Sequence, residues 1–164
     1  MRLRTTLFTF VLALVALDQI SKYAVENSLP FQQAVNVISY FSLFRTYNTG
    51  IAFSWLNWAG NTGLIVLAMV VLALVLYLWS KVRDDKQLAH IGFALIVGGA
   101  IGNLLDRLYQ GHVIDFLLLH TQTWAFAVFN LADAFITMGA VAIVIDELFS
   151  IGGDKEQTAD GPGQ

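Results

Sequence analysis

The stretch VFNLADAFITMGAVAIVI, Val128–Ile145, is as apolar as the middle of a membrane-spanning helix, yet it contains Asn130 and Asp133. A spacing of three residues places these two side chains on one face of a helix. A charge in the hydrocarbon core of a bilayer costs about 2.5–3.5 kcal/mol even on the more lenient insertion scales. The stretch therefore predicts a membrane helix whose polar residues serve a function that offsets this cost.

The composition of the whole chain indicates a membrane protein. Of its 164 residues, 57% are hydrophobic and only 13% are charged, whereas a soluble domain has about 25% charged residues. The net charge of −3 gives no argument for nucleic-acid binding. The chain has no Cys and only three His, which excludes thiolate chemistry and leaves a metal site without support. We therefore expect no metal and no other cofactor.

Four apolar runs are long enough to cross a bilayer, which takes about 17–25 helical residues. We predict helices at about residues 5–25, 62–80, 88–107 and 124–149. An outer segment at about 30–59 is rich in aromatic and β-branched residues, which predicts short strands. These elements form one membrane-embedded domain, residues 1–150. The polar, Gly-rich residues 151–164 predict a disordered tail.

The basic start MRLR and the apolar run behind it have the pattern of a secretory signal peptide. Leu14 would stand at the −3 position for a cut after Ala16, and the apolar pattern continues to Ala24. We therefore predict an uncleaved first helix. The basic residues that bracket the helices place both termini in the cytoplasm by the positive-inside rule; these are Arg2, Arg4, Lys81, Arg83, Lys86 and Lys155.

On this topology the polar residues gather towards the outer leaflet, and several of them have a structural explanation. Asp18 and Lys22 are an i,i+4 pair that can neutralise itself. Asn103, Asp106 and Arg107 can form a polar network at a helix end, and the glycines of GGAIG just before them have the spacing that allows close helix packing.

Asp115 and Asp133 are harder to explain structurally, because neither has a Lys or Arg three or four positions away. Intramembrane carboxylates of this kind are functional candidates. Two of them brought together would share one proton, as in an aspartic protease. The residues alone leave three possibilities open: a catalytic dyad, an ion or proton pathway, and a non-enzymatic scaffold. The inner half of the second helix, VVLALVLYLW, offers no polar group to a transport path.

Five pieces of the sequence decide between these possibilities. They are DQISK (18–22), NTGIAFS (48–54), GGAIGNLLDR (98–107), VIDF (113–116) and FNLAD (129–133). In their residues, order and spacing they resemble the lipoprotein signal peptidase, or signal peptidase II, family of bacterial inner membranes. The resemblance covers nearly the whole chain.

This resemblance implies an intramembrane aspartic endopeptidase that removes the signal peptide from diacylglyceryl-modified prolipoproteins, cutting just before the lipidated Cys. It implies four transmembrane helices with a small extracytoplasmic β-sheet and a short outer helix. It also implies contact with membrane lipids and inhibition by cyclic peptides such as globomycin, and we expect a monomer that binds no nucleic acid. The catalytic dyad maps onto Asp115 and Asp133. The supporting residues map onto Asp18, Asn48, Asn103, Asp106, Arg107 and Asn130.

Two points of the expected site stay open on sequence alone. One Asp would be ionised and activate water while the other, protonated, stabilises the developing oxyanion, but the sequence does not assign these states. Asn48 precedes Gly50, which permits backbone conformations that other residues resist. Asn48 would either cap a turn with its side chain or hold the substrate backbone near the dyad.

Overall fold

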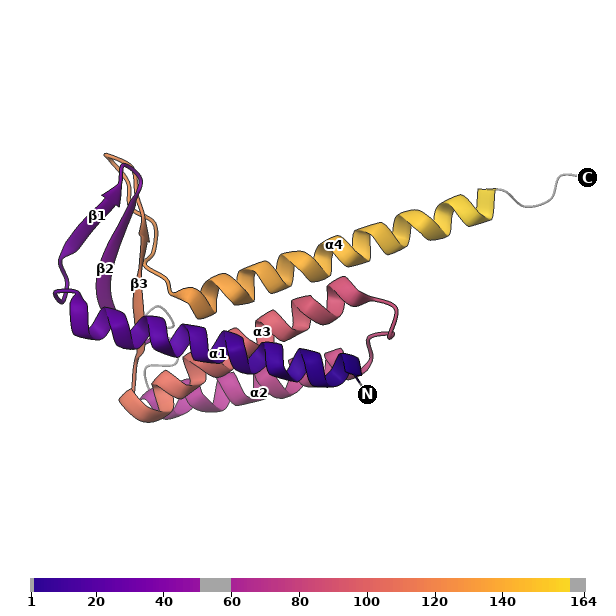
Figure 1. The fold of residues 1–164 in the computed structure, drawn as a ribbon, viewed down its shortest axis with the longest axis horizontal. Helices are drawn as coiled ribbons and strands as arrows, with labels where there is room; N and C mark the ends of the chain where they lie inside the picture. Colours follow the sequence, from indigo (N-terminus) through magenta and orange to yellow (C-terminus); the bar gives the residue numbers. More distant parts are fainter. Residues whose placement is uncertain (1, 51–59, 160–164) are drawn as a thin grey trace, which may run out of the picture.

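The computed structural model describes residues 2–50 and 60–159, with side chains described for residues 6–50 and 60–150. Four helices lie beside one another, and a three-stranded sheet stands across one end of them (Figure 1). The elements are α1 (Arg2–Ser28), β1 (Ala34–Ile38), β2 (Phe41–Asn48), α2 (Gly60–Ser80), α3 (Gln87–Gln110), β3 (Val113–Leu119) and α4 (Leu131–Ala159). The predicted fold class, four helices with a small antiparallel sheet, is confirmed.

Three of the helices are long and apolar enough to cross a membrane: Thr6–Ser28, Gly60–Ser80 and Gln87–Gln110. Their outward faces carry large apolar side chains that the rest of the protein leaves uncovered, such as Phe8 on α1 and Val70 on α2. Helix α2 has no buried residue at all. Apolar surface of this extent is stable only against lipid or another apolar partner.

Helix α4 differs from these three because it carries Asp133, Asp146 and Glu147. The uncharged part between Asp133 and Asp146 spans about 18 Å at 1.5 Å per residue. About halfway along, α4 is tied to the residue that precedes α3: Lys86 Nζ lies 3.0 Å from Glu147 Oε2 and 3.5 Å from Asp146 Oδ2.

The bounds of α4 differ from those predicted for the last helix. It begins at Leu131 instead of about residue 124, because the preceding backbone pairs with the sheet: Leu117 and Phe129 donate to each other's carbonyl oxygens at 2.7 and 3.0 Å. It continues to Ala159, into the predicted disordered tail. No Pro occurs between Leu131 and Pro162 to end it earlier.

The sheet has the order β1-β2-β3 with both pairs antiparallel. Strand β3 lies between the third and fourth predicted helices, where the sequence analysis assigned no element, and it is the most buried of the three strands. Its Ile114 and Phe116 pack with Val25 at the end of α1. Residues 51–59, which include the end of the predicted outer segment, lie outside the described residues, and the described residues contain no short outer helix.

Glycines on α3 bring α1 and α4 close to it. A Cβ at Gly98 would lie 2.9 Å from the Leu14 Cβ, and one at Gly102 would lie 2.5 Å from Asp18 Oδ2. On the other face, a Cβ at Gly92 would lie 2.8 Å from the Gly139 carbonyl oxygen of α4. The close packing expected from the GGAIG spacing is confirmed, and it places Asp18 directly against α3.

Candidate active site

The polar residues singled out by the sequence converge where the helices meet the sheet. Asp115 lies on β3 and is 2% exposed. Asp133 lies in the first turn of α4, and not deep in a helix that starts near Trp124 as the predicted bounds implied. The turn of α4 that faces the sheet therefore carries one carboxylate and the sheet carries the other.

Asn130 links these two carboxylates. Its Oδ1 accepts a hydrogen bond of 3.0 Å from the Asp133 N–H, and Asp133 Oδ2 accepts one of 3.3 Å from the Asn130 N–H. This reciprocal pair is a capping box, which satisfies N–H groups that the first turn of a helix leaves unpaired. The Nδ2 of Asn130 also donates to Asp115 Oδ1 at 2.7 Å. Asn130, which caps the start of α4, thus positions both acids.

Asn103 on α3 supports Asp133 from the other side. Its Nδ2 donates to Asp133 Oδ1 at 2.8 Å. Its Oδ1 accepts from Asn130 Nδ2 at 3.1 Å and from Lys22 Nζ at 3.0 Å. The two asparagines therefore form a continuous amide bridge between the carboxylates and Lys22.

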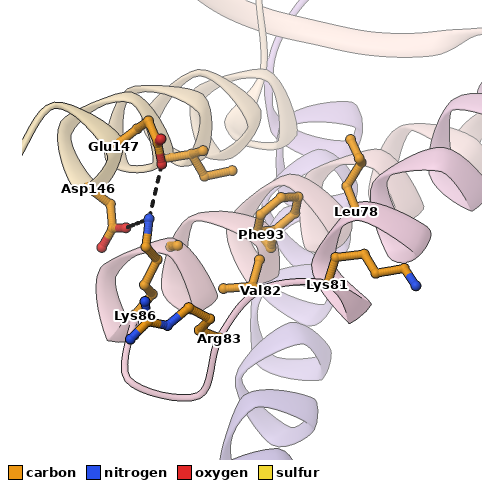
Figure 2. A pocket seen from close by; sticks show the side chains of 10 residues that line it. Leu78, Lys81, Val82, Arg83, Lys86, Phe93, Asp146 and Glu147 are labelled. Atoms are coloured by element: carbon orange, nitrogen blue, oxygen red, sulfur yellow. Dashed lines mark hydrogen bonds and ion pairs between the residues drawn. The ribbon is translucent and has the colours of Figure 1, made fainter. Parts of the chain in front are cut away.

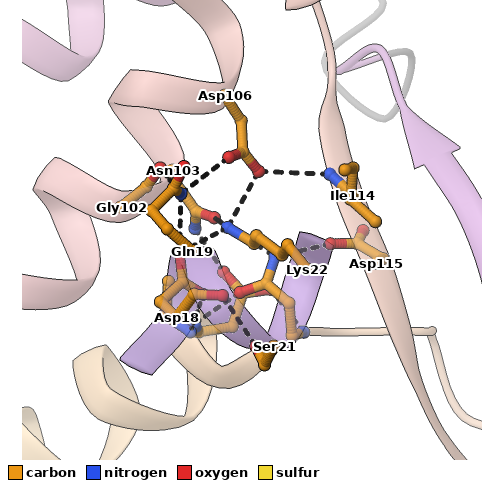
Figure 3. A network of polar contacts seen from close by, with 12 residues as sticks. Asp18, Gln19, Ser21, Lys22, Gly102, Asn103, Asp106, Ile114 and Asp115 are labelled. Atoms are coloured by element: carbon orange, nitrogen blue, oxygen red, sulfur yellow. Dashed lines mark hydrogen bonds and ion pairs between the residues drawn. The ribbon is translucent and has the colours of Figure 1, made fainter. Parts of the chain in front are cut away.

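A buried ion network lies directly behind this bridge (Figure 3). Lys22 Nζ lies 2.8 Å from Asp18 Oδ2 and 2.8 Å from Asp106 Oδ2, and all three side chains are at most 2% exposed. Asp18 Oδ1 accepts from the Ala132 N–H of α4 at 3.0 Å, and Asp106 Oδ2 accepts from the Ile114 N–H of β3 at 3.3 Å. The network therefore joins α1, α3, β3 and α4 around the two acids.

Sequence reasoning missed two members of this network. Lys22 was treated only as the partner of Asp18, and Gln19 was not considered. Gln19 Nε2 lies within 3.2 Å of three acceptors, on Asp18, Gly102 and Asp106. The signal was present in DQISK, since positions 18, 19 and 22 share one face of a helix.

Asn48 ends β2 opposite Val113 of β3, close to Asp115. Its Oδ1 accepts a hydrogen bond of 2.9 Å from the Gly50 N–H, and Gly50 has a φ of +79°, which favours glycine. Its side chain also hydrogen-bonds the Asp115 carboxyl. Both roles considered for Asn48, capping a turn and facing the dyad, are thus compatible with its position.

The surroundings of Asp115 favour its protonated form. Burial raises the pKa of this carboxyl, and the nearby Asp133 raises it further, to about 6. The hydrogen bonds from Asn130 and Asn48, and the charge of Lys22, act in the opposite direction but are weaker. Arg107, whose Nη1 donates to the Asn103 carbonyl oxygen at 3.3 Å, also lies within electrostatic range of Asp115 and Asp133.

The described residues contain no group of three or more His, Cys, Asp or Glu that could hold a metal ion. The sequence gives His112 and His120 no partner at metal-ligand spacing and predicts that they are surface residues, but both are half-buried and contact β2. The ring of His112 lies 4.0 Å from that of Tyr47, and His120 Nε2 lies 2.7 Å from the buried Ser42 Oγ. They were misread because their partners are on another strand, far away in sequence.

Two cavities open at the opposite end of the helices, away from the acids. One, of about 260 Å³, lies beside Lys86 and its partners on α4 (Figure 2). The other, of about 580 Å³, is lined mainly by apolar residues of α1, α2 and α3. Neither is lined by any of the predicted site residues.

The family described as signal peptidase (SPase) II matches residues 10–149, which is most of the chain. The chain belongs to the signal peptidase II family. It is 55% identical over 138 residues to the lipoprotein signal peptidase of Mesorhizobium japonicum, covering 84% of this chain and 82% of that one. It is 50% identical over 152 residues to the lipoprotein signal peptidase of Sinorhizobium fredii, and the match covers 88% of this chain and 92% of that one.

Two solved structures described as bacterial membrane enzymes share the fold of this signal peptidase II. One has a TM-score of 0.76 at 24% identity and covers 88% of this chain and 93% of its own. The other has a TM-score of 0.77 at 23% identity, and the match covers 98% of this chain and 94% of that one.

Membership of the family confirms the function expected from the resemblance. The protein is an aspartic endopeptidase that cleaves the signal peptides of prolipoproteins, and it is a membrane enzyme of a bacterial family. The transporter and the scaffold, which the residues alone had left open, are set aside.

Proposed function

We propose that Asp115 and Asp133 are the catalytic dyad of this peptidase and that it cuts just before the lipidated Cys of diacylglyceryl-modified prolipoproteins. The observation that carries the proposal is the contact of Asn130 with both acids: it donates to the Asp115 carboxyl and caps the turn that holds Asp133. Two carboxyls joined in this way meet the requirement of an aspartic peptidase that one be ionised while the other keeps a proton.

In this proposal the ionised Asp takes a proton from water as the water oxygen attacks the scissile carbonyl carbon. The protonated Asp hydrogen-bonds the carbonyl oxygen and stabilises its developing charge. When the C–N bond breaks, the leaving nitrogen receives a proton. No covalent enzyme intermediate is required.

The other predicted site residues then have separate supporting roles. Asn103 and Asn130 orient the carboxylates, and Asp18 and Asp106 fix the elements that carry them. We assign Asn48, Gly50 and Arg107 to the substrate side. Asn48 and Gly50 form a turn beside Asp115, and Arg107 supplies a positive charge near both acids.

The position of the dyad suits a substrate held in the membrane. It lies where apolar helices end, so a lipidated signal peptide lying along them would bring its cleavage site to the sheet. Lys81, Arg83 and Lys86 lie at the other end, between α2 and α3. By the positive-inside rule we place that end and both termini in the cytoplasm, and the dyad towards the outer leaflet of the bacterial inner membrane.

The experiment that tests the proposal uses purified full-length protein with a diacylglyceryl-modified prolipoprotein and an unlipidated form of the same precursor. We expect a gel shift for the lipidated precursor only, blocked by globomycin, with the new N-terminus at the lipidated Cys. Equal cleavage of the unlipidated form, or cleavage at another bond, would contradict the proposal.

A further inference from the structure

The two asparagines of the site can each be oriented without ambiguity. A side-chain amide has an acceptor oxygen and a donor nitrogen, and which is which must be decided from the hydrogen bonds. For Asn130 a backbone group decides, because the Asp133 N–H can only donate and therefore faces the Asn130 oxygen. The Asn130 nitrogen is then the atom that faces Asp115 and Asn103.

Lys22 decides the orientation of Asn103 in the same way. An ammonium group can only donate, and that of Lys22 lies 2.8 Å from the carboxylates of Asp18 and of Asp106. Its contact of 3.0 Å therefore fixes the Asn103 oxygen on the α1 side. The Asn103 nitrogen is left facing Asp133, to which it donates at 2.8 Å.

The two acids therefore have different hydrogen-bonding surroundings. Both oxygens of Asp133 accept hydrogen bonds from fixed donors: Oδ1 from Asn103 Nδ2 and Oδ2 from the Asn130 N–H. A proton on either oxygen would weaken one of these hydrogen bonds, because a protonated carboxyl oxygen is a poorer acceptor than an ionised one. Asp115 also has side-chain hydrogen bonds, from Asn130 and Asn48. It is only 2% exposed, however, whereas Asp133 is half-buried, and burial together with the nearby Asp133 raises the pKa of Asp115. The shared proton of the pair accordingly resides on Asp115.

We propose that Lys22 is a positioning residue which, by fixing the amide of Asn103, holds Asp133 as the carboxylate that activates water and leaves Asp115 as the acid. The inference rests on the proposed dyad and adds which of its two Asp residues acts as the base and which as the acid. Lys22 hydrogen-bonds neither acid, and its hydrogen-bonded link to Asp133 runs through Asn103. Its charge is the last and weakest of the influences on the pKa of Asp115.

The cycle balances with these assignments. Asp133 accepts a proton from water while the water oxygen bonds to the carbonyl carbon, and the Asp115 proton passes to the carbonyl oxygen. In the collapse, Asp133 gives its proton to the leaving nitrogen and the C–N bond breaks. Asp115 recovers a proton from one hydroxyl of the intermediate as the new carboxyl forms. One water is consumed and both acids return to their starting states.

A double-mutant cycle tests whether Lys22 acts through Asn103. We expect Lys22→Met and Asn103→Leu each to lower kcat by at least about tenfold with little change in KM, because acid–base catalysis depends on positioning. The double variant should lose no more than Asn103→Leu alone. Multiplicative losses in the double variant would overturn the proposal, since a general structural role of Lys22 would not depend on Asn103.

Stability controls keep this test interpretable. Lys22→Met leaves Asp18 and Asp106 without their cation, so if it fails to fold, the cycle is repeated in an Asp106→Asn background, which removes one of the two charges. A stability control lies outside this network: Trp79→Phe removes the 2.8 Å hydrogen bond from Trp79 Nε1 to His90 Nδ1. It should lower the Tm yet keep kcat within about threefold of wild type. A loss of kcat in Trp79→Phe equal to that in Lys22→Met would also overturn the proposal.

The protonation states have a readout that needs no turnover. In infrared difference spectra at about pH 5, the carboxylic-acid band should be lost in Asp115→Asn and kept in Asp133→Asn. The reverse pattern would overturn the assignment. If neither variant cleaves but the bands follow expectation, the inference stands, whereas cleavage by either variant would refute the dyad itself.

Discussion

The side-chain nitrogen of Asn130 donates a hydrogen bond of 2.7 Å to Oδ1 of Asp115. This bond joins the residue immediately before α4 to β3. It therefore holds the first turn of α4, which carries Asp133, beside the strand that carries Asp115. The site therefore depends on where α4 begins, because the side chain that caps this helix also contacts both acids.

The dyad is tested first by isosteric change. Asp115→Asn and Asp133→Asn should each reduce cleavage of a lipidated prolipoprotein to background, because neither amide can exchange a proton with water or the leaving group. Both proteins should remain folded, and wild-type activity should survive EDTA. Substantial turnover in either variant would rule out the dyad, and a loss with EDTA restored by zinc would point to a metal enzyme.

A second prediction follows from the raised pKa of Asp115. The pKa is 3.8 in an unperturbed carboxyl and about 6 in the folded protein. Protonation of Asp115 therefore stabilises the folded protein. This contribution to the free energy of unfolding is complete below about pH 4 and is lost as the pH rises through about 6. Above this range the ionised, buried Asp115 lowers the free energy of unfolding by about 3 kcal/mol, since each unit of pKa difference corresponds to about 1.4 kcal/mol. Asp115→Asn should then raise the Tm by several degrees at about pH 7.5 and leave it unchanged at about pH 4.

The matched control for this measurement is Asp85→Asn, in the exposed loop between α2 and α3. Its Tm should follow that of wild type at both pH values. An Asp115→Asn protein that is no more stable than wild type at about pH 7.5 would contradict the burial of a charged carboxyl at this position.

Close packing of α1 against α3 gives a third prediction. Gly102→Ala would place a Cβ 2.5 Å from Asp18 Oδ2, which displaces the carboxylate that holds both Lys22 and the Ala132 N–H. We expect a loss of about 1–3 kcal/mol, the usual cost of overpacking, seen as a lower Tm in detergent together with weaker cleavage. Leu108→Ala, at a residue of the same helix that is 55% exposed, is the control and should change neither. A Gly102→Ala protein with wild-type Tm would show that α1 can move away at little cost.

Topology is a fourth prediction. A reporter fused after Arg83 should be cytoplasmic and one fused after Gly60 extracytoplasmic, because the basic residues Lys81, Arg83 and Lys86 stay on the cytoplasmic side. Fusions giving the opposite result at both sites would invert the orientation of the dyad.

The sequence was sufficient for the fold class, and it singled out the two acids that Asn130 links in the structure; the reasons are local. The apolar runs have the length of a bilayer crossing, and Asp115 and Asp133 stand out because no nearby residue in the chain neutralises them. The start of α4 was predicted wrongly because the run from Trp124 to Phe129 is as apolar as the helix behind it. The spacing of Asn130 and Asp133 is that of a capping box and could have placed the start correctly.

The contacts of Lys22 could not be predicted in the same way. Asn103 is 81 residues away in sequence, and the two meet only because Gly98 and Gly102 allow α1 to lie directly on α3. The i,i+4 spacing of Asp18 and Lys22 correctly predicted one ion pair. It carried no information about the second carboxylate, Asp106, or about the amide that connects Lys22 to the dyad.

The last prediction separates the two roles of Asn48. Its Oδ1 accepts the Gly50 N–H, while its side chain also meets the Asp115 carboxyl. Asn48→Ala removes both contacts, whereas Asn48→Ser keeps a shorter acceptor for the turn. If Asn48 only caps the turn, Asn48→Ala should lower the Tm, Asn48→Ser should restore most of it, and both should cleave normally at a permissive temperature.

If Asn48 holds substrate, as we propose, both variants should cleave more slowly and bind globomycin more weakly, even where Asn48→Ser has the Tm of wild type. The planar amide then supplies what a hydroxyl cannot, a donor and an acceptor at fixed separation beside Asp115. The measurements are initial rates of prolipoprotein cleavage, globomycin affinity and the Tm of each purified variant. A folded Asn48→Ala protein with unchanged cleavage and unchanged globomycin affinity would assign Asn48 to the turn alone.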